Sequence, residues 1–137
     1  MRFGIHEVFW AKIGMSSHNL IDESAALEAL SGDRKLLSEL AVMFVEDVPG
    51  MLYELEEAID RQDFDVACRT IHSLRGLSST FYANDLVELA GRLEHDVKSA
   101  KFESLRNGGI DALKRSIAKL VEELRDSGYV RESQSGS

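Results

Sequence analysis

The sequence is poor in the residues that cross-link or interrupt small folds. Among 137 residues there is one cysteine, Cys68, and one proline, Pro49. A single cysteine excludes a disulfide framework within the chain, which is typical of proteins in a reducing compartment, and we therefore expect a cytoplasmic location. The sequence also lacks any run of 18 apolar residues, so it predicts no membrane-spanning helix.

Positive charge is scarce as well. The chain has 16 Lys and Arg residues against 24 Asp and Glu residues, which gives a formal net charge of -8. An acidic chain of this kind has no electrostatic reason to bind nucleic acid or an anionic membrane, and we expect neither as a partner. No His, Cys and carboxylate residues cluster at metal-ligand spacing, so we expect no metal site.

The length corresponds to one ordinary domain, which we place at residues 15–127. Residues 1–14 are unusually apolar, and we interpret them as an N-terminal extension or linker whose apolar side chains need a buried surface on the bundle or in a dimer. Residues 128–137 end in a polar, Gly- and Ser-rich stretch that predicts a disordered tail.

Apolar residues recur at helical spacing, and no segment alternates in the manner of a strand. The pattern predicts helices over about residues 22–30, 33–61, 63–82, 84–100 and 110–124. The apolar phase of the second helix continues through Pro49, which favours one kinked helix over two separate ones. Asp33 and Asp63 are the expected N-caps of the second and third helices, and Asp22 or Ser24 that of the first. The predicted fold is all-α: an antiparallel four-helix bundle with a short additional N-terminal helix.

The helix expected over residues 63–82 carries a histidine opposite its apolar stripe. On a wheel of about 100° per residue, His72 lies across from the stripe formed by Ala67, Ile71, Leu74, Leu77, Ser78 and Phe81. Arg69 and Arg75 flank it at i-3 and i+3. Gly76, one turn on, costs the helix about 1 kcal/mol relative to Ala, so we expect it to have a function: it uncovers one flank of the imidazole.

An exposed imidazole between two arginines suits attack on phosphorus. Neutral imidazole is a good nucleophile near pH 7, and phosphoryl transfer needs positive charge against the phosphate oxygens. Arg69 and Arg75 are therefore the candidate phosphate-stabilising residues. A lone histidine on a solvated helix is more often an ordinary surface residue, so the helical wheel leaves both interpretations open.

The segment His72-Ser73-Leu74-Arg75-Gly76-Leu77-Ser78 resembles the His-x-Leu-Lys-Gly-x-Ser signature of histidine-containing phosphotransfer (HPt) domains. Residues 36–76 and 86–94 are similar to the family's helices in the same order. The resemblance implies that His72 is the phosphoacceptor, taking a phosphoryl group from the aspartate of one receiver domain and passing it to another. The receivers, in response regulators or hybrid histidine kinases, would supply Mg²⁺. The chain itself would need no cofactor and have no kinase activity of its own.

Cys68, Gly76 and Ser79 lie within about 60° of His72 on the wheel, and we name them as the candidate docking face for a receiver. Two residues depart from the family's pattern: Arg75 replaces the usual Lys, and Tyr82 replaces a frequent Gly at the junction after the histidine helix. Two alternatives therefore stay open. One is a degenerate HPt-like docking module that binds receivers without phosphotransfer, and the other is the phosphoacceptor domain of a chemotaxis-type histidine kinase.

Overall fold

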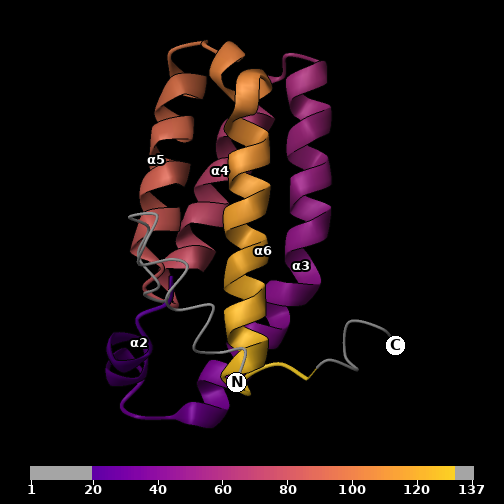
Figure 1. The fold of residues 1–137 in the computed structure, drawn as a ribbon. Coiled ribbons are helices and arrows are strands. Elements are labelled where there is room, and N and C mark those ends of the chain that lie inside the picture. The colour runs from indigo at the N-terminus through magenta and orange to yellow at the C-terminus, as the bar shows by residue number, and fades with distance from the viewer. Residues whose placement is uncertain (1–19, 132–137) are drawn as a thin grey trace, which may run out of the picture.

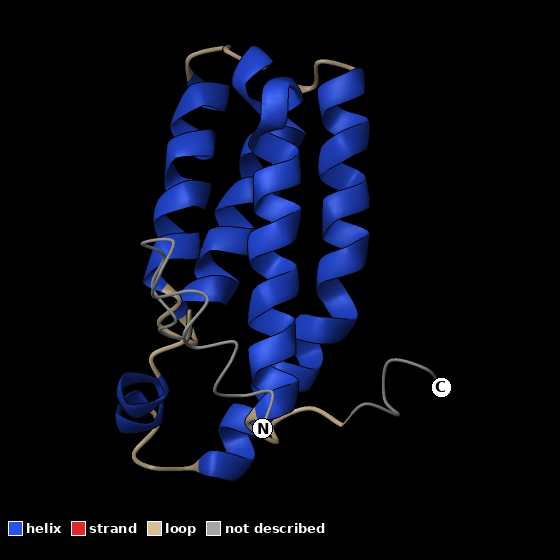
Figure 2. Ribbon diagram, in the orientation of Figure 1, coloured by secondary structure: helices blue, strands red, loops and turns tan. Residues whose placement is uncertain are grey.

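The computed structural model describes residues 20–131, and every regular element within that range is a helix (Figures 1 and 2). The helices are α2 (Glu23–Ala29), α3 (Arg34–Asp60), α4 (Phe64–Ser79), α5 (Asn84–Lys98), the short η1 (Leu105–Gly109) and α6 (Ile110–Asp126). The prediction of an all-α fold is confirmed. The predicted extension over residues 1–14 and the last part of the predicted tail, residues 132–137, lie outside the described residues.

The four long helices form an antiparallel bundle in which α4 packs between α3 and α5 (Figure 1). Helix α6 contacts α5 and α3, and so lies diagonally across from α4. The short α2 lies at the end of the bundle where α4 ends and α5 begins, because the Asp22 N–H donates to the carbonyl of Phe81 at 3.2 Å. The backbone N–H groups of Leu20 and Ile21 donate to the Glu123 carboxylate of α6 at 2.8 and 2.9 Å.

Three helices begin at the aspartates that the sequence indicates. The carboxylates of Asp22, Asp33 and Asp63 accept hydrogen bonds from the backbone N–H three residues on, at 3.1, 3.0 and 3.2 Å. Each such cap is worth about 1 kcal/mol relative to alanine, because it satisfies an N–H that has no partner within the helix. Pro49 lies within α3, which runs unbroken for 27 residues, so the prediction of one helix through the proline is confirmed.

The core consists largely of the apolar stripes that the sequence predicts. Phe44 of α3 and Phe81 are both about 1% exposed, and their rings meet edge to face at 5.4 Å between centroids. Leu77 was expected on the buried stripe of α4, yet it is 36% exposed. It lies about 140° from His72 on the wheel, at the edge of the stripe, where the neighbouring helix no longer covers it.

The sequence predicts a break between the helices over 84–100 and 110–124, and the chain does turn there, between α5 and α6. Asn107 and Gly108 leave the helical backbone conformation, and Gly108 has a φ of +111°, in the left-handed region that glycine adopts readily. Gly109 has a different requirement: a Cβ there would lie 2.6 Å from the Ser104 carbonyl oxygen. The two glycines therefore let the chain turn tightly into α6.

The packed domain continues beyond residue 127, which corrects the predicted start of the tail. Tyr129 and Val130 are each 3% exposed. The Tyr129 hydroxyl donates to the Glu23 carboxylate, and its carbonyl accepts from the Ser38 hydroxyl at 2.6 Å. Burial, with the nearby Glu23 carboxylate, raises the pKa of Tyr129 to about 12. Tyr129 thus links α2 and α3, and residues 128–130 belong to the packed domain.

Helix α4 ends at Ser79, three residues before the predicted end, and Tyr82 has a φ of +52°. The junction therefore keeps the left-handed conformation that a glycine would adopt, although a tyrosine occupies it. A side chain in this conformation costs about 1–2 kcal/mol because its Cβ approaches the following carbonyl.

We expect Tyr82→Gly to be more stable than Tyr82→Ala by about 1 kcal/mol. Both variants lose the ring, so their difference isolates the backbone conformation. Urea unfolding of the two proteins measures this difference, and equal unfolding free energies would contradict the expected strain at Tyr82.

Candidate functional site

His72 lies near the middle of α4 with its side chain 64% exposed. On the other side of the same helix, Ala67, Ile71 and Leu74 are at most 1% exposed. The prediction that the ring is exposed and clear of the core is therefore confirmed. The same periodicity that buries one face of α4 presents the imidazole on the other.

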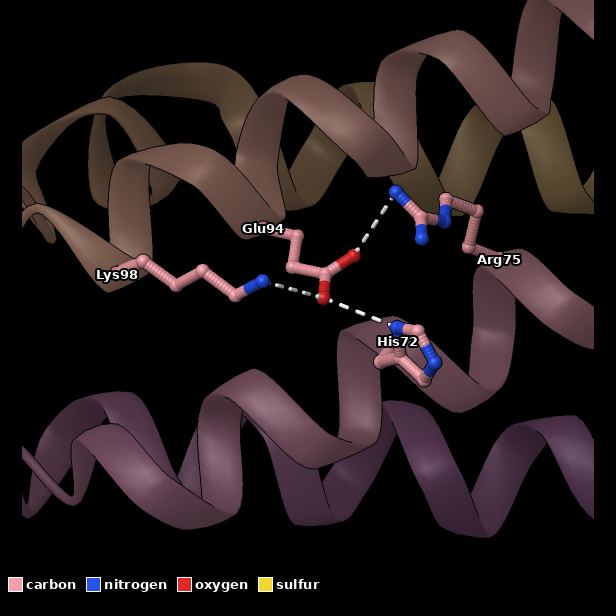
Figure 3. Close-up of polar contacts among 4 residues, drawn as sticks. All are labelled: His72, Arg75, Glu94 and Lys98. Atoms are coloured by element: carbon pink, nitrogen blue, oxygen red, sulfur yellow. Dashed lines mark hydrogen bonds and ion pairs between the residues drawn. The ribbon is translucent and has the colours of Figure 1, made fainter.

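The imidazole is held by a buried carboxylate on the neighbouring helix (Figure 3). The Nδ1 atom of His72 lies 3.0 Å from Oε2 of Glu94 in α5, and the Glu94 side chain is only 4% exposed. Glu94 was not among the site residues predicted from the sequence. The signal that could have found it is its position: Glu94 lies one turn after Ala90 and one turn before Val97, beside the buried stripe of α5, where a carboxylate requires a partner.

Two cations also contact the same carboxylate. Nη1 of Arg75 lies 3.2 Å from Glu94 Oε1, and Nζ of Lys98 lies 3.4 Å from Oε2 (Figure 3). The Arg75 side chain passes over Gly91 of α5, since a Cβ on that residue would lie 3.5 Å from Nη1. A buried carboxylate is costly unless it is paired, and these three groups supply the compensation. We call His72, Arg75, Glu94 and Lys98 the histidine cluster.

The cluster determines which ring nitrogen can react. A carboxylate only accepts hydrogen bonds, so Nδ1 of His72 carries the proton and donates it to Glu94. In the neutral ring the lone pair then belongs to Nε2, which points away from Glu94 in Figure 3. When Nε2 forms a new bond the ring becomes cationic, and the adjacent carboxylate stabilises that charge. The arrangement therefore suits an exposed nucleophile whose product is a cation.

The other predicted site residues lie in different surroundings. Gly76 and Ser79 are exposed on the His72 side of α4, and a Cβ on Gly76 would meet no atom within 4 Å. Cys68 is half-buried against the core. Arg69 is exposed and forms no ion pair with any other residue in the range 20–131, whereas Arg75 is engaged with Glu94. The docking role of Cys68, Gly76 and Ser79, and the phosphate-stabilising role of both arginines, stay predictions.

We expect Glu94→Gln to slow phosphoryl transfer to His72 by roughly tenfold to a hundredfold, because a hydrogen bond to a charged group is worth about 1.5–3 kcal/mol. Stability should fall by only about 1 kcal/mol, since Arg75 and Lys98 reach water without their partner. Single-turnover transfer kinetics measure the first effect and urea unfolding the second.

Glu88→Gln is the matched control, because Glu88 is exposed on the same helix. NMR of ¹⁵N-labelled histidine adds a readout that a purely structural role would not change. Glu94→Gln should shift the His72 tautomer populations and Glu88→Gln should leave them unchanged. Wild-type tautomer populations in Glu94→Gln would contradict the orienting role.

Between Leu20 and Arg131, no three His, Cys, Asp or Glu side chains gather in a way that could hold a metal ion. No helix in that part of the chain is both long enough and apolar enough to cross a membrane.

Comparison with known proteins gives one family match. The family model Hpt domain matches residues 39–127, which is more than half of the chain and includes the whole histidine cluster. Neither the curated proteins nor the solved structures give a match to this chain.

Proposed function

Because the chain belongs to the Hpt domain family, we propose that it relays phosphoryl groups between receiver-domain aspartates with His72 as the phosphoacceptor. The observation that carries this proposal is the Nδ1 contact of His72 with Glu94, which leaves Nε2 exposed and nucleophilic. Family membership supplies the class of reaction, histidine phosphotransfer in phosphorelays. The histidine cluster supplies the residue and the atom.

The transfer begins with the acyl phosphate on a receiver aspartate. As Nε2 of His72 forms a bond to phosphorus, the bond from phosphorus to the aspartate oxygen breaks, and the aspartate leaves as a carboxylate. The ring gives its lone pair and keeps its Nδ1 proton, so it gains one positive charge facing Glu94. The reverse sequence on a second receiver returns the ring to its neutral form.

Positive charge around Nε2 comes from two arginines with different roles. Arg75 is fixed by Glu94 at 3.2 Å and has further N–H groups to donate to phosphoryl oxygens. Arg69 is exposed one turn away and free to turn toward the phosphoryl group. The Mg²⁺ that receiver chemistry uses belongs to the receiver, and the chain contributes no cofactor of its own. We place this activity in the cytoplasm, with receivers of response regulators or hybrid kinases as partners.

The docking-module alternative is motivated by the departure at Tyr82. This residue takes the left-handed conformation that the helix junction needs, which favours an intact HPt fold. The histidine cluster also favours phosphotransfer over docking alone, since the buried Glu94 carboxylate, paired with the cations Arg75 and Lys98, orients the His72 ring. The chemotaxis-type kinase alternative uses the same imidazole with a different phosphoryl donor, namely ATP on a kinase domain.

The decisive experiment mixes the chain with a phosphorylated receiver and measures phosphate on the chain. We expect acid-labile, base-stable phosphate, the pattern of a phosphoramidate, with none after incubation with ATP alone. A complex that forms without phosphate transfer would instead establish the docking module. Phosphate that arrives only with ATP and a kinase domain, and never from a receiver, would favour the chemotaxis-type alternative.

A further inference from the structure

The bundle has an apolar groove on the side away from the histidine helix. Helices α3 and α6 form its walls, with the lining residues Val42, Val45, Pro49 and Leu52 from α3 and Ile117 and Val121 from α6. Several of these side chains are only partly buried by the rest of the described chain. A continuous apolar surface of this kind on a small acidic domain indicates a site that something covers.

The groove also contains an arginine whose Nε atom has no hydrogen-bond acceptor within the described part of the chain. This residue is Arg125, which lines the groove with its Nε atom buried. The other cation of the groove, Lys114, forms an ion pair with Glu56 at 2.7 Å. Glu46 lines the groove as well, yet no ion pair joins it to Arg125. A buried donor without an acceptor is unfavourable, so an occupant should bring an acceptor beside its apolar groups.

Residues 1–14 combine apolar side chains with a hydrogen-bond acceptor. This segment contains the large apolar residues Phe3, Ile5, Val8, Phe9, Trp10 and Ile13, and one carboxylate, Glu7, with the basic Arg2 and Lys12 near its two ends. The carboxylate lies in the middle of the apolar residues, as an occupant of an apolar groove with one unpaired arginine Nε would require.

The segment also starts close enough to reach the groove. Leu20 and Ile21 are hydrogen-bonded to Glu123, two residues before Arg125 on α6. The Glu123 and Arg125 side chains point about 160° apart around the α6 axis, so the chain must pass around a helix roughly 10–12 Å across. The residues between Glu7 and Leu20 span up to roughly 40 Å when extended, which is long enough for Glu7 to reach Arg125. A tethered segment is present at an effective concentration near millimolar, which favours it over a second copy.

We infer that residues 1–14 of the same chain occupy the α3/α6 groove, with their apolar side chains against its walls and Glu7 paired with Arg125. This inference is independent of the phosphorelay. Residues 1–14 would cover the bundle face opposite α4, and the surface around His72 would stay open for partners.

Trp10 is the single tryptophan of the chain, so fluorescence of the full chain reports this docking directly. We expect blue-shifted emission that acrylamide quenches poorly, unchanged on dilution. Arg125→Glu, or Val121→Glu on the groove wall, should abolish the blue shift, and combining Glu7→Arg with Arg125→Glu should restore it. Lys119→Glu is the matched control: it makes the same charge change at an exposed position of α6 away from the groove.

Circular dichroism checks that each variant is folded, and Arg125→Gln replaces Arg125→Glu if the latter does not fold. Three results would overturn the inference: emission of exposed indole in the unaltered chain, a blue shift that survives both groove substitutions, or a blue shift lost on dilution. The last result would identify a second copy of the chain as the occupant.

Discussion

The His72→Gln chain should take up no acid-labile phosphate from a phosphorylated receiver, while its unfolding free energy changes by at most about 0.5 kcal/mol. Glutamine has no nucleophilic lone pair on nitrogen, so the phosphoramidate cannot form. The side chain is 64% exposed, and the glutamine amide can still donate a hydrogen bond to Glu94. Transfer assays and urea unfolding measure the two quantities on the same protein.

The matched control is His95→Gln on α5. His95 is also exposed, but it lies outside the histidine cluster. This control should keep wild-type uptake. If His72→Gln still acquires acid-labile phosphate, another residue is the acceptor and the role given to the cluster is wrong.

The second large effect is expected from Gly76→Glu. A side chain on Gly76 enters open space, so the substitution places a carboxylate one turn from His72 without disturbing the packing. The carboxylate fills the path of an approaching receiver and repels the phosphoryl group. Like charges in contact cost several kcal/mol, so transfer should fall by roughly a hundredfold or more. The bundle should be as stable as before or more stable, because Glu favours helix over Gly by about 1 kcal/mol.

Two variants at the same position separate the causes. Gly76→Gln keeps the size of glutamate without its charge, and Gly76→Ala adds only a methyl group. We expect transfer rates to fall in the order Ala, Gln, Glu, with circular dichroism unchanged throughout. A folded Gly76→Glu protein that transfers at the wild-type rate would mean that receivers approach His72 from another side.

The helices, their aspartate caps and the exposure of His72 could be predicted because each depends on residues within one or two turns. Periodicity decides which face of α4 is buried, and an aspartate just before an apolar run caps it locally. The passage of α3 through Pro49 followed from the same local pattern. These features need no knowledge of how the helices pair.

The contacts that the sequence did not reveal are between helices. Glu94 lies 22 residues from His72, and only the packing of α5 on α4 brings the two side chains within 3.0 Å. Leu77 has the spacing of a core residue but lies where no neighbouring helix covers it. Tyr129 is part of the packed domain because Glu23 and Ser38 reach it, which no local pattern near the C-terminus indicates.

The central claim is that the phosphoryl group binds Nε2 of His72 while Nδ1 remains bonded to Glu94. NMR of the ¹⁵N-histidine-labelled, phosphorylated chain measures this most directly, because ³¹P coupling identifies the nitrogen that carries phosphorus. We expect a single phosphorylated histidine, His72, with coupling at Nε2 and a protonated Nδ1. Phosphorus on Nδ1 of His72, or on any other residue, would contradict the account.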